Sequence, residues 1–398
     1  MNPAQTIQQL AKDYAANLLQ IRRHLHSHPE LSFEEIETAK FVRMQLEQMG
    51  ITQIKPMANT GFEVLIEGKN PGKKTIALRG DMDALPIVEA NEVSYKSQNP
   101  GVMHACGHDV HTTCLLGAAY ILTQLKDQFE GTIKLIFQPG EEKLPGGASL
   151  MIKEGILQNP KVEAIIGQHV MPLIPVGKVG FRSGLYMAST DELYMTITGK
   201  GGHGAMPHLC IDPVAVMAQI ITGLQQLVSR NANPIIPSVL TFGKVIANGA
   251  TNVIPNEVYL EGTFRTLNEK WRATAHEKMH HMATEIAEAF GAKVDFEIRK
   301  GYPFLMNEPS LTAKARTTAE TYLGKENVVD LDIWMAAEDF SYYSQEVPAC
   351  FYRLGTRNEA KGIVSGVHTS TFDIDEAALE IGAGLMAYIA LKELEGES

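Results

Sequence analysis

The stretch that decides the fold is Thr132-Ile-Lys-Leu-Ile-Phe137, which is apolar at nearly every position. The runs Thr75–Leu78 and Ala164–Gln168 have the same character. Strands of this kind, without alternation of apolar and polar residues, are typical of parallel sheets covered on both faces. Helices are expected between them, near residues 108–126 and 146–154. Strands that alternate with helices predict an α/β domain with a mostly parallel sheet.

Two helices are expected before these strands. Residues 5–28 have an amphipathic pattern that ends near Pro29. Ser32–Glu35 fits the capping box S-x-x-E, which predicts that a second helix opens there and continues to about Met49. Phe62–Glu67 is expected to be a strand. This N-terminal part therefore belongs to the same α/β domain.

A different pattern occupies the middle of the chain. Strands are expected at 193–198, 238–246, 258–265 and 293–299, and helices at 213–229 and 268–290. The resulting order, β-α-β-β-α-β, is the ferredoxin-like signature. The α/β pattern then resumes with a helix near 308–322, a strand at 350–354 and a last helix near 375–394. We therefore expect a catalytic domain at residues 1–185 and 301–398, interrupted by a ferredoxin-like domain at residues 186–300.

Composition excludes several classes of protein. The 398 residues are 44% hydrophobic and 20% charged, which is typical of a globular chain. The chain has 46 acidic and 35 basic residues, which gives a formal charge of −11. This negative charge argues against nucleic acid as the main partner. No apolar run reaches the roughly 18 residues of a membrane helix, and the polar N-terminus lacks a signal-peptide pattern. Only four cysteines occur and none forms a C-x-x-C pair, which argues against a disulfide framework. A reducing environment, and hence a cytoplasmic location, is therefore expected.

The first chemically informative segment is Met103-His-Ala-Cys-Gly-His-Asp-Val-His111. Cys106 and His108 lie two residues apart, where a loop leads into a predicted helix. A thiolate and an imidazole are good ligands for zinc and similar metals. Two other interpretations remain open for the isolated segment. The cysteine could be a small buried residue beside a helix-capping histidine, or the pair could be a nucleophilic dyad.

Acidic residues follow two of the predicted strands. In Gln138-Pro-Gly-Glu-Glu142, one glutamate can bind a metal while the other takes a proton from a metal-bound water. In Arg79-Gly-Asp-Met-Asp-Ala-Leu-Pro86, Asp81 and Asp83 stand where a site is expected, and such a carboxylate can orient a histidine ligand. Carboxyl ends of parallel strands are where α/β sheets place their ligands. The alternatives are a solvated acidic turn and an Asp-rich turn.

Further histidines are ambiguous when each is taken alone. His169 ends a predicted strand and His368 lies in Val367-His-Thr-Ser-Thr-Phe-Asp; a structural role is the simpler interpretation of each. His203 is surrounded by glycines in the inserted domain, which indicates either a close backbone approach or a flexible loop. His24, His26 and His28 fall at a helix end and are interpreted as mostly structural.

Together, these segments resemble the aminoacylase and carboxypeptidase-G-like family of dinuclear metallopeptidases. The branch of the hippurate hydrolases and indole-acetyl-amino-acid amidohydrolases is the most similar. The resemblance covers nearly the whole chain. Its motifs are Arg22-Arg23-x-x-x-x-x-His28-Pro-Glu, Arg79-Gly-Asp-Met-Asp-Ala-Leu-Pro, His104-Ala-Cys-Gly-His-Asp, Gly140-Glu-Glu, Gly167-Gln-His169, Gly199-Lys-Gly-Gly-His-Gly, Asn252-Val-Ile-Pro and Ala337-Glu-Asp-Phe340. Gly140 departs from the alanine that is common in relatives.

The resemblance implies a role for each candidate site residue. It implies five metal ligands: Cys106, His108, Glu142, His169 and His368. Glu141 matches the general base, and Asp83 matches a carboxylate beside the metal site. His203 matches a histidine of the lid domain that stabilises the oxyanion in a neighbouring subunit's site. Asn252 and Arg265 match positions near the carboxylate end of the substrate.

The resemblance also implies an activity, namely metal-dependent hydrolysis of N-acyl amino acids. Two divalent ions per subunit, chosen from Zn, Mn, Ni and Co, would hold a water and lower its pKa. The inserted domain would act as lid and dimerisation domain, so that a homodimer or a larger homo-oligomer is expected. A dipeptidase, an N-acyl diamino acid deacetylase, a non-catalytic metal-bound scaffold and a cysteine hydrolase are the alternatives. Neither a nucleic acid nor a membrane is expected as a partner.

Overall fold

The computed structural model describes residues 2–395, which form two compact units. The first unit extends from the beginning of the described chain to Tyr186 and also contains Met306–Ile333 and the described residues from Asp339 onward. The second unit contains Met187–Leu305 and Trp334–Glu338. Each unit has its own hydrophobic core, so each is described separately.

The first unit is built on an eight-stranded sheet with the strand order β1-β2-β4-β3-β5-β16-β6-β15. Its strands are β1 Ile54–Met57, β2 Gly61–Glu67, β3 Thr75–Asp81, β4 Thr132–Gln138, β5 Ala164–Pro175, β6 Val179–Phe181, β15 Val328–Asp330 and β16 Ala349–Arg357. The neighbours β4, β3, β5 and β16 at the centre are parallel. The mostly parallel α/β sheet that the sequence predicts is therefore confirmed.

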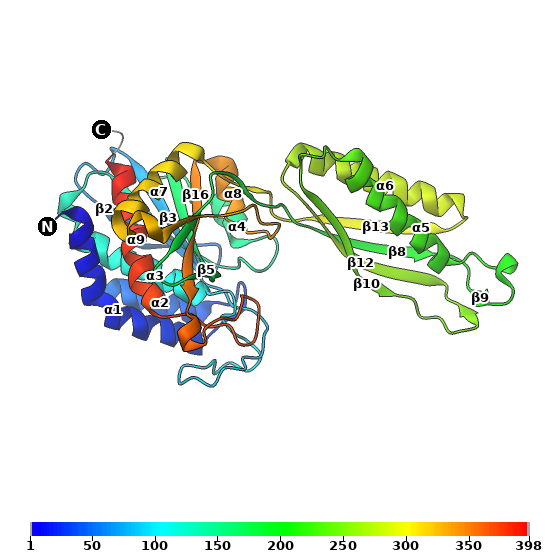
Figure 1. Ribbon diagram of the computed structural model, residues 1–398, viewed down its shortest axis with the longest axis horizontal. Coiled ribbons are helices and arrows are strands. Elements are labelled where there is room, and N and C mark those ends of the chain that lie inside the picture. The colour runs from blue at the N-terminus through cyan, green and yellow to red at the C-terminus, as the bar shows by residue number, and fades with distance from the viewer. Residues whose placement is uncertain (1, 396–398) are drawn as a thin grey trace. The chain divides into compact units, whose positions relative to one another are not determined.

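Helices cover this sheet. They are α1 Pro3–Ser27, α2 Ile36–Gln48, α3 His108–Gln124, α4 Gly147–Lys153, α7 Pro309–Leu323, α8 Ser341–Glu346 and α9 Ala377–Leu394. Helices α1, α3 and α9 pack against one another and contribute most of the helical side of the main core (Figure 1). Among the helices of residues 2–395, none combines the length and apolar character required to cross a membrane.

The prediction of a capping box at Ser32 is wrong. Helix α2 begins at Ile36, and the cap residue Glu35 makes no capping hydrogen bond. The Ser32 hydroxyl instead donates to Asp83 Oδ2 at 2.6 Å, and Glu35 Oε1 accepts a hydrogen bond from the Gly140 backbone N–H at 2.8 Å. The physical reason is tertiary, because Asp83 offers the hydroxyl a buried carboxylate and Gly140 offers Glu35 a buried N–H.

The second unit contains an antiparallel sheet with the order β10-β12-β8-β13. Its elements are β8 Asp191–Thr198, α5 Pro213–Gln226, β10 Ser238–Ile246, β12 Glu257–Thr266, α6 Glu269–Ala289 and β13 Lys293–Lys300. Helices α5 and α6 lie side by side on one face of the sheet (Figure 1). Asp212 caps α5, because its side chain accepts a hydrogen bond from the Val214 N–H. This succession is the β-α-β-β-α-β order of a ferredoxin-like unit.

Short elements complete the chain. They are β7 Gly184–Met187, β9 Gly202–His203, β11 Val253–Ile254 and β14 Leu305–Asn307, the helical turns Lys126–Gln128, Pro207–Leu209, Lys325–Asn327 and Glu359–Lys361, and the π-helical turn Leu227–Asn231. In the second unit, β9 and β11 form a separate two-stranded ribbon. All four cysteines are free thiols, which agrees with the absence of a disulfide framework in the sequence pattern.

Candidate metal centre

The candidate ligands of the first unit gather at the carboxyl ends of its parallel strands. Glu141 and Glu142 follow β4. His169, which the sequence predicts at the end of its strand, instead lies inside β5, because this strand continues to Pro175 and still pairs with β16 beyond His169. Cys106 lies in the loop before α3, and His108 is the first residue of that helix. Gly107 between them has φ +84°, and a Cβ there would lie 2.6 Å from the Val170 side chain. Only glycine fits this turn, which places Cys106 and His108 beside the strand ends.

All five predicted ligands lie together, with the thiol at the centre. Cys106 Sγ is 3.4 Å from His169 Nε2 and 3.3 Å from His368 Nε2. Glu142 Oε1 lies 3.1 Å from His368 Nε2 and 3.9 Å from His108 Nε2. Two groups of potential metal-binding atoms share the thiol, namely Cys106 with His108 and His169, and Cys106 with Glu142 and His368. In each group the atoms lie within 4.8 Å of one another.

Asp83 connects two of these ligands. Its Oδ1 lies 3.0 Å from His108 Nδ1, and its Oδ2 accepts a hydrogen bond from the Glu142 backbone N–H at 2.9 Å. Since a carboxylate is only an acceptor, His108 donates through Nδ1 and directs its Nε2 toward the other ligands. An orienting role for Asp83, which the family resemblance implies, requires a contact of this kind.

A second carboxylate–histidine pair was not predicted as part of the site. Asp81 Oδ1 lies 2.6 Å from His111 Nδ1, and His111 Nε2 accepts a hydrogen bond from the Val170 N–H at 2.9 Å. His111 thereby supports the backbone next to His169. Its spacing of three residues from His108 places both rings on one side of α3, and this spacing was the available signal.

Two segments that carry the family resemblance, those of Arg79 and Asp339, meet beside Glu141. The Asp339 N–H donates to Glu141 Oε1 at 3.4 Å. The Asp339 carboxylate in turn accepts hydrogen bonds from Arg79 at 2.8 Å and from Gln138 at 2.9 Å. Arg79 also pairs with Asp81, so one buried network connects the ends of β3 and β4 with the segment that contains Asp339.

The electrostatics of the cluster suit divalent cations. Burial and the nearby carboxylates of Glu142, Glu141 and Asp81 raise the pKa of the Cys106 thiol far above its usual range. Burial, reinforced by Arg353, lowers the pKa of His169 and keeps its imidazole neutral, the form that binds metals. A thiolate among carboxylates requires positive charge nearby, and metal ions supply that charge.

One orphaned atom supports the same conclusion. Burial disfavours the charged form of His108, but Asp81 and Asp83 raise its pKa to about 10. Among the residues that the structure describes, its buried Nε2 has no hydrogen-bond partner. Sulfur, nitrogen and oxygen donors arranged in this way fit ions such as zinc, manganese, nickel or cobalt. The residues present therefore fit a pair of divalent metals.

The other three predicted residues belong to the second unit. The exposed His203 pairs with Val253 in the β9–β11 ribbon, and the Gly204 N–H donates to the Asn252 carbonyl at 2.8 Å. His203 and Asn252 are thus brought together. Arg265 lies on β12, where its Nη1 donates to the Met335 carbonyl at 3.4 Å.

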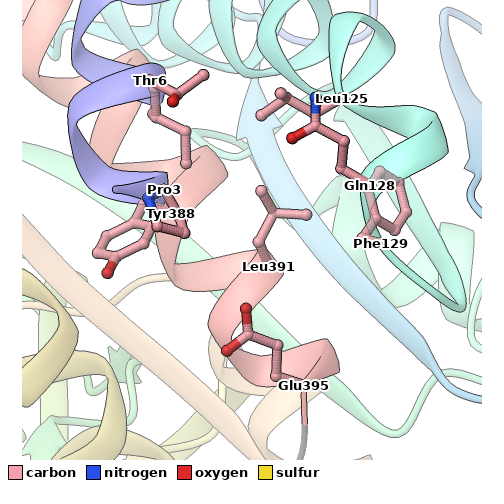
Figure 2. A pocket seen from close by; sticks show the side chains of 9 residues that line it. Pro3, Thr6, Leu125, Gln128, Phe129, Tyr388, Leu391 and Glu395 are labelled. Atoms are coloured by element: carbon pink, nitrogen blue, oxygen red, sulfur yellow. The ribbon is translucent and has the colours of Figure 1, made fainter. Parts of the chain in front are cut away.

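The first unit has a further pocket that contains none of the candidate metal ligands. Figure 2 shows its lining, contributed by the beginning of α1, the turn that follows α3 and the end of α9. The lining residues are Pro3, Thr6, Ile7, Leu125, Gln128, Phe129, Tyr388, Leu391 and Glu395. None of the candidate site residues is among them, so this pocket does not belong to the metal centre.

The fold thus presents a cluster of potential metal ligands at the carboxyl edge of an α/β sheet. The sequence model of peptidase family M20/M25/M40 matches residues 77–392. The chain belongs to this family. The family resemblance inferred from the motifs is thereby confirmed.

Relatives place the chain among amidohydrolases of this family. It is 41% identical over 378 residues to the N-acetyl-L-cysteine deacetylase of Bacillus subtilis, covering 95% of this chain and 88% of that protein. It is 43% identical over 301 residues to an N-acyl-L-amino acid amidohydrolase of Geobacillus stearothermophilus, covering 76% and 80%. A solved Bacillus subtilis protein, described as a dinuclear metal binding peptidase of family M20, is 35% identical with a TM-score of 0.82, covering 97% and 100%.

Proposed function

We propose that this protein hydrolyses the amide bond of N-acyl amino acids and releases a free acid and a free amino acid. The observation that carries the proposal is the grouping of Cys106, His108, Glu142, His169 and His368, with Glu141 beside them. The relatives named as an N-acetyl-L-cysteine deacetylase and an N-acyl-L-amino acid amidohydrolase support this substrate class.

The five ligands would hold two divalent cations. When bound, these cations supply Lewis-acid chemistry, polarising a carbonyl and lowering the pKa of a water. Zinc, manganese, nickel and cobalt all suit a donor set of one thiolate, one carboxylate and three imidazoles. Cys106 belongs to both groups of donor atoms, so we propose that its thiolate serves both cations.

Glu141 is proposed as the general base. It is buried, and the group of His108, Glu141 and Glu142 brings its carboxylate within 4.8 Å of two ligand atoms. From this position, Glu141 takes a proton from the attacking water and then passes it to the nitrogen of the leaving amine. The Asp339 N–H contact to Oε1 holds the carboxylate in place.

His203 is proposed as the donor to the oxyanion. The Ala205 N–H donates to His203 Nδ1 at 3.1 Å, so the proton of the neutral ring resides on Nε2. An exposed Nε2–H on a glycine-rich ribbon can donate a hydrogen bond to developing negative charge. We propose that it acts in the site of a second subunit, within a homodimer or a larger homo-oligomer.

Asn252 and Arg265 are proposed to bind the carboxylate end of the substrate. Arg265 can form a charge-assisted hydrogen bond with a carboxylate, and Asn252 lies on the same ribbon as His203. We further propose a cytoplasmic location, which suits a protein with four free thiols.

The test is a substrate panel assayed by mass spectrometry. N-acetyl, N-benzoyl and indole-acetyl amino acids, N-acyl diamino acids and simple dipeptides would be offered to metal-loaded and metal-stripped protein. We expect metal-dependent release of amino acid from acyl conjugates. Release only from dipeptides would indicate a dipeptidase, and release only from diamino acids a deacetylase. Binding of metal without any turnover would favour a scaffold, and turnover that resists chelators but not thiol alkylation would favour a cysteine hydrolase.

A further inference from the structure

His368 differs from the other four candidate ligands in its surroundings. Its side chain is 52% exposed, whereas the side chains of His108, Cys106 and His169 are buried. It lies in the loop before α9 and has φ +61°, a left-handed conformation that is uncommon outside glycine. Strained backbone of this kind persists only where the surrounding structure holds it.

Backbone contacts hold the first part of this loop. The His368 N–H donates to the Ala105 carbonyl at 2.7 Å, and the Ala90 N–H donates to the Ser370 carbonyl at 2.8 Å. These bonds connect the loop with two other segments of the chain, at Ala105 and at Ala90. The Asp375 N–H, near the end of the loop, donates to the Thr356 carbonyl at 3.0 Å, and between Ser370 and Asp375 a side chain adds a further anchor.

Asp373 provides this side-chain anchor. Its Oδ1 accepts from Arg22 Nη2 at 2.7 Å, and its Oδ2 accepts from the Tyr95 hydroxyl at 2.7 Å. The Arg22 guanidinium also lies 4.8 Å from the centre of the Tyr95 ring, a cation–π contact. The three side chains therefore support one another.

Arg22 connects this anchor with helix α3. It is fully buried in α1, and its Nε donates to Asp109 Oδ2 at 2.9 Å. Asp109 directly follows His108 in α3. One guanidinium thus joins the residue after His108 to the loop that carries His368. The function proposed above leaves Arg22, Tyr95 and Asp373 without a role.

We propose that Arg22, Tyr95 and Asp373 are positioning residues that hold His368 in reach of Cys106 and Glu142. This inference rests on the proposed metal centre and deepens it. If the anchor is released, the strained His368 backbone can relax and withdraw one ligand. The group of Cys106, His108 and His169 does not contain His368, so the loss falls on one cation rather than on both.

The test measures cobalt binding to the whole protein, by equilibrium dialysis and by competition with a chromogenic chelator. Asp373→Ala removes the anchor, while Arg22 keeps Asp109 and Glu376 as partners. We expect two ions in the wild type, and in Asp373→Ala a 10- to 100-fold weaker affinity for one of them. Asp373→Asn should restore part of this loss, because its amide oxygen can still accept from Arg22.

Tyr95→Phe removes only the hydroxyl and retains the ring against Arg22, so we expect about a tenfold loss for the same ion. Tyr194→Phe is the matched control, since it deletes a 2.8 Å bond from a tyrosine to Glu192 in the second unit. It should leave both affinities unchanged. Thermal unfolding of the metal-stripped variants provides a readout of structural damage.

The outcomes separate the inference from the proposed function. Two ions of unchanged affinity in Asp373→Ala would overturn the positioning role. Equal weakening of both ions, together with a lower unfolding temperature of the stripped protein, would show a merely structural role and would also overturn it. A wild type that binds fewer than two cobalt ions would remove the dinuclear centre itself, and this inference with it.

Discussion

Asp83 Oδ1 lies 3.0 Å from His108 Nδ1, and this single contact determines which nitrogen of the ring faces the other ligands. Because the other carboxylate oxygen accepts from the Glu142 N–H, Asp83 aligns an imidazole and a carboxylate ligand at the same time. The predictions below follow from this centre and from the residues around it.

Replacing the proposed base should separate catalysis from metal binding. In Glu141→Gln we expect kcat to fall by about 10²- to 10⁴-fold, because the amide cannot accept the proton of water. The metal content, measured by inductively coupled plasma mass spectrometry, should remain at the wild-type level. Glu346→Gln, an exposed change on α8, is the control. Full activity in Glu141→Gln would remove the base assignment.

Replacing the Cys106 thiol should instead reduce metal binding. In Cys106→Ser we expect metal content to fall first, because a serine hydroxyl remains protonated where a thiolate would bind both cations. The loss of activity should follow the loss of metal when both are measured on the same preparation. Cys210→Ser, a change far from the ligand group in sequence and in the other unit, should retain metal. Unchanged metal in Cys106→Ser would make Cys106 a structural cysteine.

Glu35 should make stability depend on pH. Its burial, with the charge of Asp83, raises its pKa to about 7, compared with 4.5 as the ordinary value. Above pH 7 the native state bears the cost of a buried charge. As the pH falls from 7 to 4.5, the native state binds a proton that the unfolded state does not, so this carboxyl's contribution becomes more favourable by up to about 3 kcal/mol.

Glu35→Gln tests this prediction by urea unfolding of the metal-stripped protein between pH 5 and 8. The glutamine oxygen can still accept from Gly140 and Phe33, and its amide can donate to Thr60. We expect the variant to be more stable than the wild type at pH 8, with the difference shrinking toward pH 5. Glu47→Gln, an exposed change on the same helix, should show no such trend. A difference independent of pH would contradict the prediction.

The proposed donation across subunits can be tested by mixing two inactive variants. His203→Ala and Glu141→Gln should each lose activity, but a mixed dimer would contain one site with both groups intact. After subunit exchange at equal amounts, we expect roughly a quarter of the wild-type activity. Analytical ultracentrifugation under assay conditions should show a dimer or larger species. A fully active monomer would rule out donation in trans.

Much of the fold could be predicted because it depends on local patterns. The nearly continuous apolar run of β4 predicted a covered parallel strand, and the strand–helix order of residues 193–299 predicted the ferredoxin-like connectivity. Short strands such as β6 and β15 were missed. They contain three residues each, so they carry no periodicity that a sequence pattern could reveal.

The candidate ligands could be predicted from the sequence, but the residues that hold them through hydrogen bonds could not. Each of the five ligands belongs to a short motif whose residue types indicate metal chemistry, although His169 lies inside β5 and not at its end. The partner of Ser32 was predicted wrongly, because Ser32 fits a local capping box and yet donates to the Asp83 carboxylate, 51 positions away. His111 and Arg22 gave no local sign of what they bind.

The sequence by itself determined which residues can carry the chemistry, since ligand type and strand-end placement are properties of short segments. Only the tertiary structure decided which of them meet, because contacts such as that of His368 with Cys106 join residues 262 positions apart. The tertiary structure also explains Gly140, which has φ +57°. A Cβ at this position would collide with the Phe33 ring. Distances across a fold follow from packing the whole core, and no single stretch of chain contains them.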